Sequence, residues 1–112
     1  RNEVVSVEKE ASIFVRSDRK MVKVRFNEIR YIESLSDYVK IFTNQETIVT
    51  RETISNIESK LPSKDFLRTH RSYIVSMSQI NSYTNEFVEL EKKAIPISRS
   101  YKENVLKKLT GK

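Results

Sequence analysis

The stretch from Phe66 to Val75, FLRTHRSYIV, gives the first indication of both structure and role. Basic residues flank His70, the only histidine of the chain, and an apolar segment of β type follows at once. No cysteine and no glycine-rich loop lies beside it. The pattern is typical of a polar edge carried on a buried strand, and such an edge presents side chains to a charged partner.

The composition limits what kind of protein this is. Its 112 residues are enough for one domain with a modest core. Lysine and arginine outnumber aspartate and glutamate by 21 to 15, which favours nucleic acid, an anionic membrane surface or an acidic protein as partner. The absence of cysteine excludes disulfides and thiolate metal sites, and a single glycine excludes the phosphate-binding loops of nucleotide enzymes.

The hydropathy and the first residue of the chain indicate its setting. No apolar run approaches the roughly 18 residues of a membrane span, and no signal-peptide pattern appears. We therefore expect a cytoplasmic protein without membrane association. Because Arg1 is not a usual natural start, we expect residues 1–11 to be a lead-in from a missing upstream domain. Residues 12–112 are expected to form the folded domain.

Short β-branched segments of alternating polarity run through most of the chain. Pro96 cannot donate to a strand ladder, so the strand that contains it is expected at an edge or at its own end. The segments that we interpret as strands are 13–15, 21–26, 29–35, 38–43, 47–49, 66–67, 72–75, 80–83, 87–90 and 94–97.

Two helices are predicted among these strands. Thr50 is a candidate N-cap for a helix over residues 51–60, which carries an apolar stripe and ends before Pro62. Ser100 and Glu103 have the spacing of a capping box and predict a short final helix. The strands do not alternate with helices as in a doubly wound α/β fold. The expected fold class is therefore mostly β, with small antiparallel sheets and one or two short helices.

The histidine and the aromatic residues are expected to serve the fold, and not catalysis, metal binding or the stacking of bases. One histidine without cysteine cannot form a usual zinc site, and a His70–Ser72 pair lacks any signalled orienting acid or oxyanion hole. We therefore expect no catalytic residue, no metal and no cofactor. The aromatic residues alternate with aliphatic ones, which predicts core packing and not an exposed platform for RNA bases. They include Tyr31, Phe42, Phe66 and Tyr73.

Four segments are most informative when read in order. They are FNEIRYIES at 26–34, DYVKI at 37–41, FLRTHRSYIV at 66–75 and IPISRSY at 95–101. Together they resemble the LytTR-type DNA-binding domain of bacterial two-component response regulators, and the third segment is close to the signature of that family. The resemblance covers roughly residues 12 to 110.

The resemblance implies a function and a set of partners. Members of the family bind double-stranded DNA through loop side chains inserted into successive major grooves, without a recognition helix. This chain is then expected to be the effector domain of a transcriptional response regulator in a phosphorelay, with a receiver domain upstream and paired promoter repeats as target. The isolated domain is expected to be largely monomeric and to pair on DNA.

The resemblance also implies site residues. Arg71 and Arg99 match DNA-facing positions, and an arginine can bond both O6 and N7 of guanine. Asp37 and Tyr38 match the first base-reading loop. Asp37 either accepts a hydrogen bond from cytosine N4 or bonds its own backbone, and Tyr38 either contacts a phosphate or packs. We expect His70 to hydrogen-bond within the fold and fix the loop of Arg71, and DNA contact is its alternative role.

A further group of residues is expected to contact phosphates, which supplies affinity without sequence information. These residues are Lys40, Ser72, Ser98, Ser100, Lys102 and Lys107. The chain departs from the family at three places. Asp37 stands where many members have Asn, Ser100 stands where a second Arg is common, and Ser76 stands where Asn is frequent. The preferred DNA sequence is therefore expected to differ from that of other members.

Two other functions stay open from the sequence. A small β interaction module that docks an acidic protein would bind DNA weakly and without sequence preference. A hydrolase would need a nucleophile and a base that the sequence does not show. Sequence-specific binding of duplex DNA is the preferred interpretation.

Overall fold

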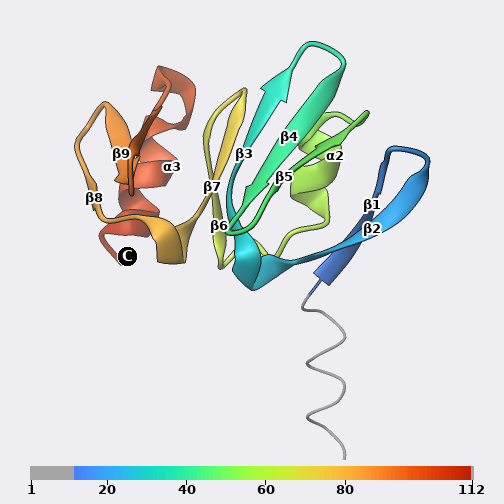
Figure 1. Cartoon of the computed structure of the whole chain (residues 1–112). Coiled ribbons are helices and arrows are strands. Elements are labelled where there is room, and N and C mark those ends of the chain that lie inside the picture. The colour runs from blue at the N-terminus through green and yellow to red at the C-terminus, as the bar shows by residue number, and fades with distance from the viewer. Residues whose placement is uncertain (1–11, 112) are drawn as a thin grey trace, which may run out of the picture.

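The computed structural model describes residues 12–111, so the predicted lead-in at residues 1–11 lies outside the described part of the chain. Strands dominate that part and form small antiparallel sheets (Figure 1). The expected fold class is confirmed. The elements are β1 (Ser12–Ser17), β2 (Lys20–Arg25), η1 (Phe26–Glu28), β3 (Ile29–Leu35), β4 (Tyr38–Thr43), β5 (Thr47–Thr50), α2 (Ile54–Ser59), β6 (Phe66–His70), β7 (Tyr73–Ser76), η2 (Met77–Gln79), β8 (Ser82–Tyr83), β9 (Phe87–Leu90), β10 (Lys93–Pro96) and α3 (Arg99–Leu109).

A five-stranded sheet in the order β5-β4-β3-β7-β6 forms the centre of the fold. Strands β3 and β4 have the predicted bounds, and Ile32 lies opposite Ile41 in their antiparallel pair. Strand β7 pairs with the other side of β3, where Ile32 lies opposite Ile74. Because side chains alternate between the two faces of a strand, this sheet carries apolar residues on both faces, and both must be covered.

Different elements cover the two faces (Figure 1). On one face Ile32 packs in a core with Ile57 of α2 and Val24 of the β1–β2 hairpin. On the other face Val75 packs in a second core with residues of β9, β10 and α3, including the fully buried Val105. The central sheet is therefore a middle layer, held from both sides, and its turns project from a rigid support.

The two smaller sheets lie on either side of this layer. Strands β1 and β2 form a hairpin whose outer face exposes Phe14 and Met21. Its turn places Asp18 and Arg19 in the left-handed region, at φ 52° and 68°, as two-residue hairpin turns require. The other sheet has the order β10-β9-β8, so Pro96 lies in an edge strand as predicted.

The predicted start of the first helix is wrong by three residues. Thr50 remains in β5, buried and opposite Val39, so it cannot cap a helix. Thr53 is the N-cap instead, and its Oγ1 accepts a hydrogen bond from the Asn56 N–H at 3.1 Å. Both threonines are suitable caps by sequence, and the tertiary pairing of β4 with β5 decides between them.

The second helix and some strands also differ from the prediction. Helix α3 begins at Arg99, with Ser98 at its N-cap and no side-chain cap hydrogen bond, so the predicted capping box at Ser100 is not formed. Strand β6 continues to His70, because it pairs with β7 along its length. Strand β8 is only Ser82–Tyr83, since the chain first makes the short helix η2.

Candidate nucleic-acid interface

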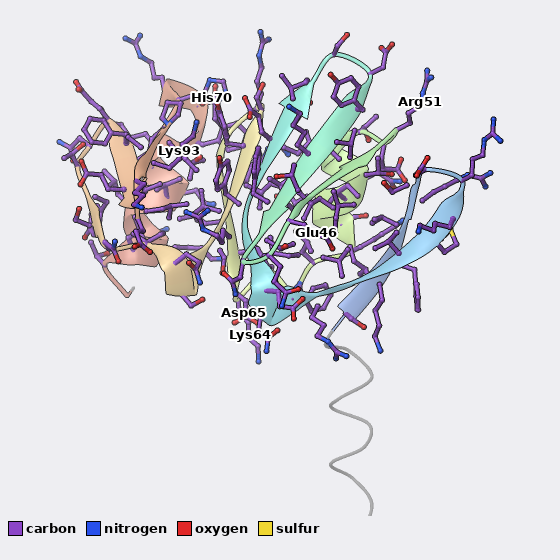
Figure 2. The ribbon with its side chains drawn as sticks, in the orientation of Figure 1. Glu46, Arg51, Lys64, Asp65, His70 and Lys93 are labelled. Atoms are coloured by element: carbon purple, nitrogen blue, oxygen red, sulfur yellow. The ribbon has the colours of Figure 1, made fainter. Side chains whose placement is uncertain are left out.

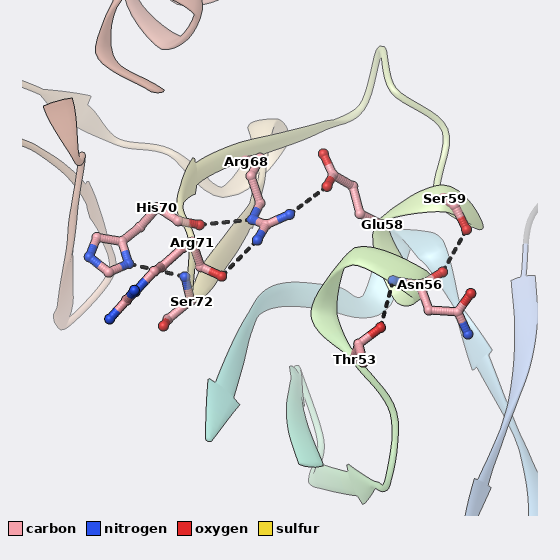
Figure 3. Close-up of polar contacts among 8 residues, drawn as sticks. All are labelled: Thr53, Asn56, Glu58, Ser59, Arg68, His70, Arg71 and Ser72. Carbon is pink, nitrogen blue, oxygen red and sulfur yellow. Dashed lines mark hydrogen bonds and ion pairs between the residues drawn. The ribbon is translucent and has the colours of Figure 1, made fainter. Parts of the chain in front are cut away.

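The turn between β6 and β7 carries Arg71 and Ser72 and is fixed by Arg68 (Figure 3). Arg68 Nε donates to the His70 carbonyl at 2.8 Å, and Nη2 donates to the Arg71 carbonyl at 2.7 Å. Arg68 Nη1 also forms an ion pair with Glu58 Oε1 of α2 at 2.6 Å. One guanidinium group therefore satisfies two carbonyls of the turn and joins the turn to a helix.

His70 fixes the same turn from its other side. Its Nδ1 accepts a hydrogen bond from the Ser72 N–H at 3.0 Å (Figure 3). An accepting Nδ1 carries no proton, so the hydrogen of the neutral ring is on Nε2. The predicted hydrogen bond of His70 within the fold is confirmed. The side chain of Arg71 is exposed, and Ser72 is half-buried.

A row of polar side chains crosses the central sheet beside this turn. The ring of His70 meets Tyr73 edge-on at 5.7 Å between centroids, and the Tyr73 hydroxyl donates to Glu33 Oε2 at 3.1 Å. Burial, followed by the hydrogen bond to Glu33, raises the pKa of Tyr73, so its hydroxyl stays protonated at neutral pH. Lys40 lies opposite Glu33 and is half-buried. Lys40 therefore belongs to the sheet and not to a turn.

The turn between β3 and β4 is joined to the first turn by the backbone. The Ser34 N–H donates to the Ser72 carbonyl at 2.8 Å. Asp37 is exposed, and within residues 12–111 its carboxylate accepts no hydrogen bond, so the self-bonded turn is not formed. Tyr38 is 36% exposed at the start of β4. Both side chains remain accessible to a partner.

The start of α3 is joined to the same edge. The Ser98 N–H donates to the Thr69 carbonyl at 2.9 Å. Arg68 also lies 5.4 Å from the centre of the Tyr101 ring, a cation–π contact between β6 and α3. Arg99 directly follows Ser98, and Arg71 lies two residues after Thr69. Both arginines are therefore attached close to the hydrogen bond between Ser98 and Thr69.

Three segments therefore meet at one edge of the central sheet (Figure 1): the β3–β4 turn, the β6–β7 turn and the start of α3. Arg99 and Ser100 are exposed there, and Lys102 is half-buried one turn on. Lys107 lies apart from them in the last turn of α3. At 1.5 Å per residue it is about 14 Å along the helix from Ser98.

The sequence prediction missed two arginines. Arg68 occupies a strand position where a cation needs partners, and its partner Glu58 lies on another element. Arg51 is exposed and lines a shallow groove with Ser36 and Asp37. Figure 2 shows Arg51 and His70 on the same side of the molecule, opposite Lys64 and Asp65. A cation that directly follows a strand end was the only sequence signal for Arg51.

Comparison with known proteins agrees with this geometry. The family described as LytTr DNA-binding domain matches residues 19–110. The chain belongs to this family. The LytTr domain is 33% identical over 98 residues to "Sensory transduction protein LytT" of Bacillus cereus, covering 82% of this chain and 39% of that protein. It is 31% identical over 91 residues to "Transcriptional regulatory protein NatR" of Bacillus subtilis, covering 74% of this chain and 39% of that protein.

A solved structure confirms the fold of the LytTr domain. It is the LytTr DNA-binding domain of a putative methyl-accepting/DNA response regulator from Bacillus cereus, which matches with a TM-score of 0.75 and 22% identity over 88% of this chain and 96% of that chain. The chain spans about two fifths of the length of the curated relatives it matches. Among residues 12–111, no helix is long and apolar enough to cross a membrane, and no group of three metal-ligating side chains comes together.

Proposed function

We propose that this LytTr domain binds double-stranded DNA in a sequence-dependent manner, as the effector domain of a transcriptional response regulator. The observation that carries the proposal is the joining of three exposed segments at one sheet edge by backbone hydrogen bonds. Ser72 accepts from Ser34, and Thr69 accepts from Ser98. Because these bonds connect main chains, the spacing of the three segments is fixed before any partner arrives.

Arg71 and Arg99 are the proposed base-reading residues. Each is exposed and carried on a segment that the fold holds in place. A guanidinium group that bonds O6 and N7 of guanine gives about 1–3 kcal/mol of discrimination. Asp37 is proposed to accept from cytosine N4, and the nearby Arg51 offsets the repulsion between its carboxylate and phosphates.

The remaining polar residues of this edge are proposed to contact phosphates. Ser98 makes no side-chain cap hydrogen bond, and the Tyr101 N–H donates to the Ser98 carbonyl. The N–H groups of Arg99 and Ser100 are therefore the ones proposed to bind a phosphate oxygen. The proposed phosphate contacts at this edge are Tyr38, Lys40, Ser72, Ser98, Ser100 and Lys102. Lys107 is placed too far along α3 for the same contact and would touch only a more distant part of a duplex.

The whole protein is proposed to contain more than this domain. Relatives named as transduction and regulatory proteins are more than twice as long as the matched segment, which supports an upstream receiver domain. We propose that the isolated domain is monomeric, pairs on promoter repeats, acts in the cytoplasm and works by binding without catalysis.

The proposal is tested by in vitro selection of random duplexes with this domain, followed by fluorescence anisotropy. The selected duplex should bind more tightly than a shuffled duplex, and log K should fall with log salt at a slope of about −0.9 per phosphate contact. Equal binding of the two duplexes at moderate salt would contradict sequence-dependent binding and favour the docking of an acidic protein.

Substitution of Arg71 by alanine tests the base-reading role. Arg71→Ala should reduce the preference for the selected over the shuffled duplex by about 10- to 100-fold, because only base contacts carry sequence information. The fold should be unaffected, since Arg68 bonds the main-chain carbonyl of Arg71 and not its side chain. Lys64→Ala is the matched control, because it removes one charge from the opposite side of the molecule (Figure 2). An equal loss for both duplexes would show that Arg71 contacts only phosphate.

A further inference from the structure

The β1–β2 hairpin is the most basic segment of the described chain. Residues 12–25 contain five basic side chains and one acidic one, Asp18, in a protein whose net charge is +6. Arg19 and Lys20 are exposed at the turn. The family match begins at residue 19, so β1 lies outside it. Four of the five basic residues, from Arg19 to Arg25, lie inside the match, and Arg16 precedes it.

The hairpin is attached to the central sheet near the proposed interface. Ser17 Oγ, at the end of β1, donates to the Val49 carbonyl in β5 at 2.8 Å. Arg51 follows β5 directly, and its groove is shared with Asp37 of the β3–β4 turn. Figure 1 shows the β1–β2 turn on the same side of the molecule as the β3–β4 and β6–β7 turns. The basic turn therefore continues the interface edge outward.

The charges on this extension are not neutralised within the fold. The ion pairs among residues 12–111 are Lys60–Glu52 and Arg68–Glu58, and neither includes Arg19, Lys20 or Arg51. The neighbouring acids are Asp18, Asp37 and Glu52, and Glu52 already pairs with Lys60 at 3.9 Å. The left-handed backbone of Arg19 fixes the turn, so its cations are presented from a defined loop.

We propose that Arg19, Lys20 and Arg51 contact backbone phosphates of duplex DNA beyond the segment read by the three joined loops. This rests on the proposed function and lengthens the DNA site on one side only. The Cα atoms span 40 × 39 × 24 Å, and an edge that crosses the molecule matches about 12 base pairs at roughly 3.4 Å each. The partner is a polyanion with regularly spaced charges, so the contact adds affinity without sequence preference.

Duplexes of different length test the one-sided contact. The selected core is bound as a short duplex, with about 5 base pairs of arbitrary sequence added to one end, or with the same addition at the other end. The wild-type domain should bind one of the two lengthened duplexes more tightly than the short one. Equal affinities at the two ends would overturn the inference.

Charge-removing variants identify the residues involved. The variant Arg19→Asn/Lys20→Gln/Arg51→Gln should lose the benefit of the lengthened end and reduce the magnitude of the salt slope by up to about 2.7, which is about 0.9 for each contact. Asn is chosen at position 19 because it tolerates a positive φ. Lys64→Gln, which removes one charge from the opposite side, should still bind the lengthened duplex more tightly than the short one. It is compared with Arg51→Gln, which removes one charge from the proposed contact.

The outcomes separate this inference from the proposed function. In one outcome the wild-type domain prefers the selected over the shuffled core, while the triple variant binds every duplex with the same affinity as the wild type. In that case the proposed hairpin contact is refuted and the proposed function stands. If no core sequence is preferred by the wild type, the proposed function itself is wrong. Circular dichroism of the triple variant must match the wild type, and the single variants Lys20→Gln and Arg51→Gln repeat the comparison without changing the turn.

Discussion

Two turns that each carry an exposed arginine, β6–β7 with Arg71 and β1–β2 with Arg19, are built in different ways. The β6–β7 turn is fixed by side chains, because Arg68 bonds two of its carbonyls and His70 bonds its Ser72 N–H. The β1–β2 turn depends on its own strand ladder. The hydrogen bond from Ser17 Oγ to the Val49 carbonyl joins it to the central sheet, and Val24 of the hairpin packs in the core. Reading a base edge needs a fixed side-chain origin, whereas a phosphate contact tolerates movement. The difference predicts that specificity is located in the first turn and sequence-independent affinity in the second.

The largest expected effect comes from removing Arg68. Arg68→Met would leave the His70 and Arg71 carbonyls and the Glu58 carboxylate without their donor, and we expect unfolding free energy to fall by about 2–4 kcal/mol. Urea unfolding measures this loss. Arg68→Lys keeps the charge but not the planar fork, so it should recover less than half of the stability. Full recovery by lysine would show that charge alone supports the turn.

A smaller effect is expected from His70. His70→Ala leaves the Ser72 N–H unpaired, at a cost of about 1–2 kcal/mol, and should loosen the turn that carries Arg71. His70→Asn is the matched variant, because its Oδ1 can accept the same hydrogen bond. Stability by urea unfolding and the preference for the selected duplex should both fall with alanine and recover with asparagine. Loss of DNA preference with both variants, at full stability, would assign His70 a direct DNA contact instead.

The smallest expected effect is on stability and concerns the N-caps of α2 and α3, the two helices that contact Arg68. Thr53→Ala removes the cap of α2, which carries Glu58, and should lower stability by about 1 kcal/mol. Ser98→Ala removes no cap hydrogen bond from α3, so stability should change by less than about 0.5 kcal/mol. Thermal unfolding of the two variants measures both values. Equal losses would mean that the hydroxyl of Ser98 supports α3 after all.

Much of the fold could be predicted from local pattern. Strands β3 and β4 have the predicted bounds, because each is an apolar and aromatic segment between clear turn residues, and in β4 the buried Val39 and Ile41 alternate with less buried residues. The helix starts could not be predicted, since Thr50 and Thr53 are equally good caps and only the pairing of Thr50 with Val39 excludes the first. The strand continuation to His70 likewise depends on a distant partner strand.

The site shows the same limit. Arg71 and Arg99 were predicted as DNA-facing because they match positions of the family that the chain resembles, and their contact with DNA stays a proposal. The support from Arg68 was not found, because Glu58 is ten residues away on a helix whose position depends on the whole core. The joining of the three segments rests on Ser34–Ser72 and Ser98–Thr69, which are contacts between residues far apart in the chain.

The most direct test of the central claim is a single NMR titration of the ¹⁵N-labelled domain with its selected duplex. We expect the amide signals of Asp37, Arg71 and Arg99 to move most, those of Arg19 and Arg51 to move less, and those of Lys64 and Asp65 to stay in place. Movement centred on Lys64 and Asp65, with the signals of the three joined segments unchanged, would show that DNA binds on the opposite side of the molecule.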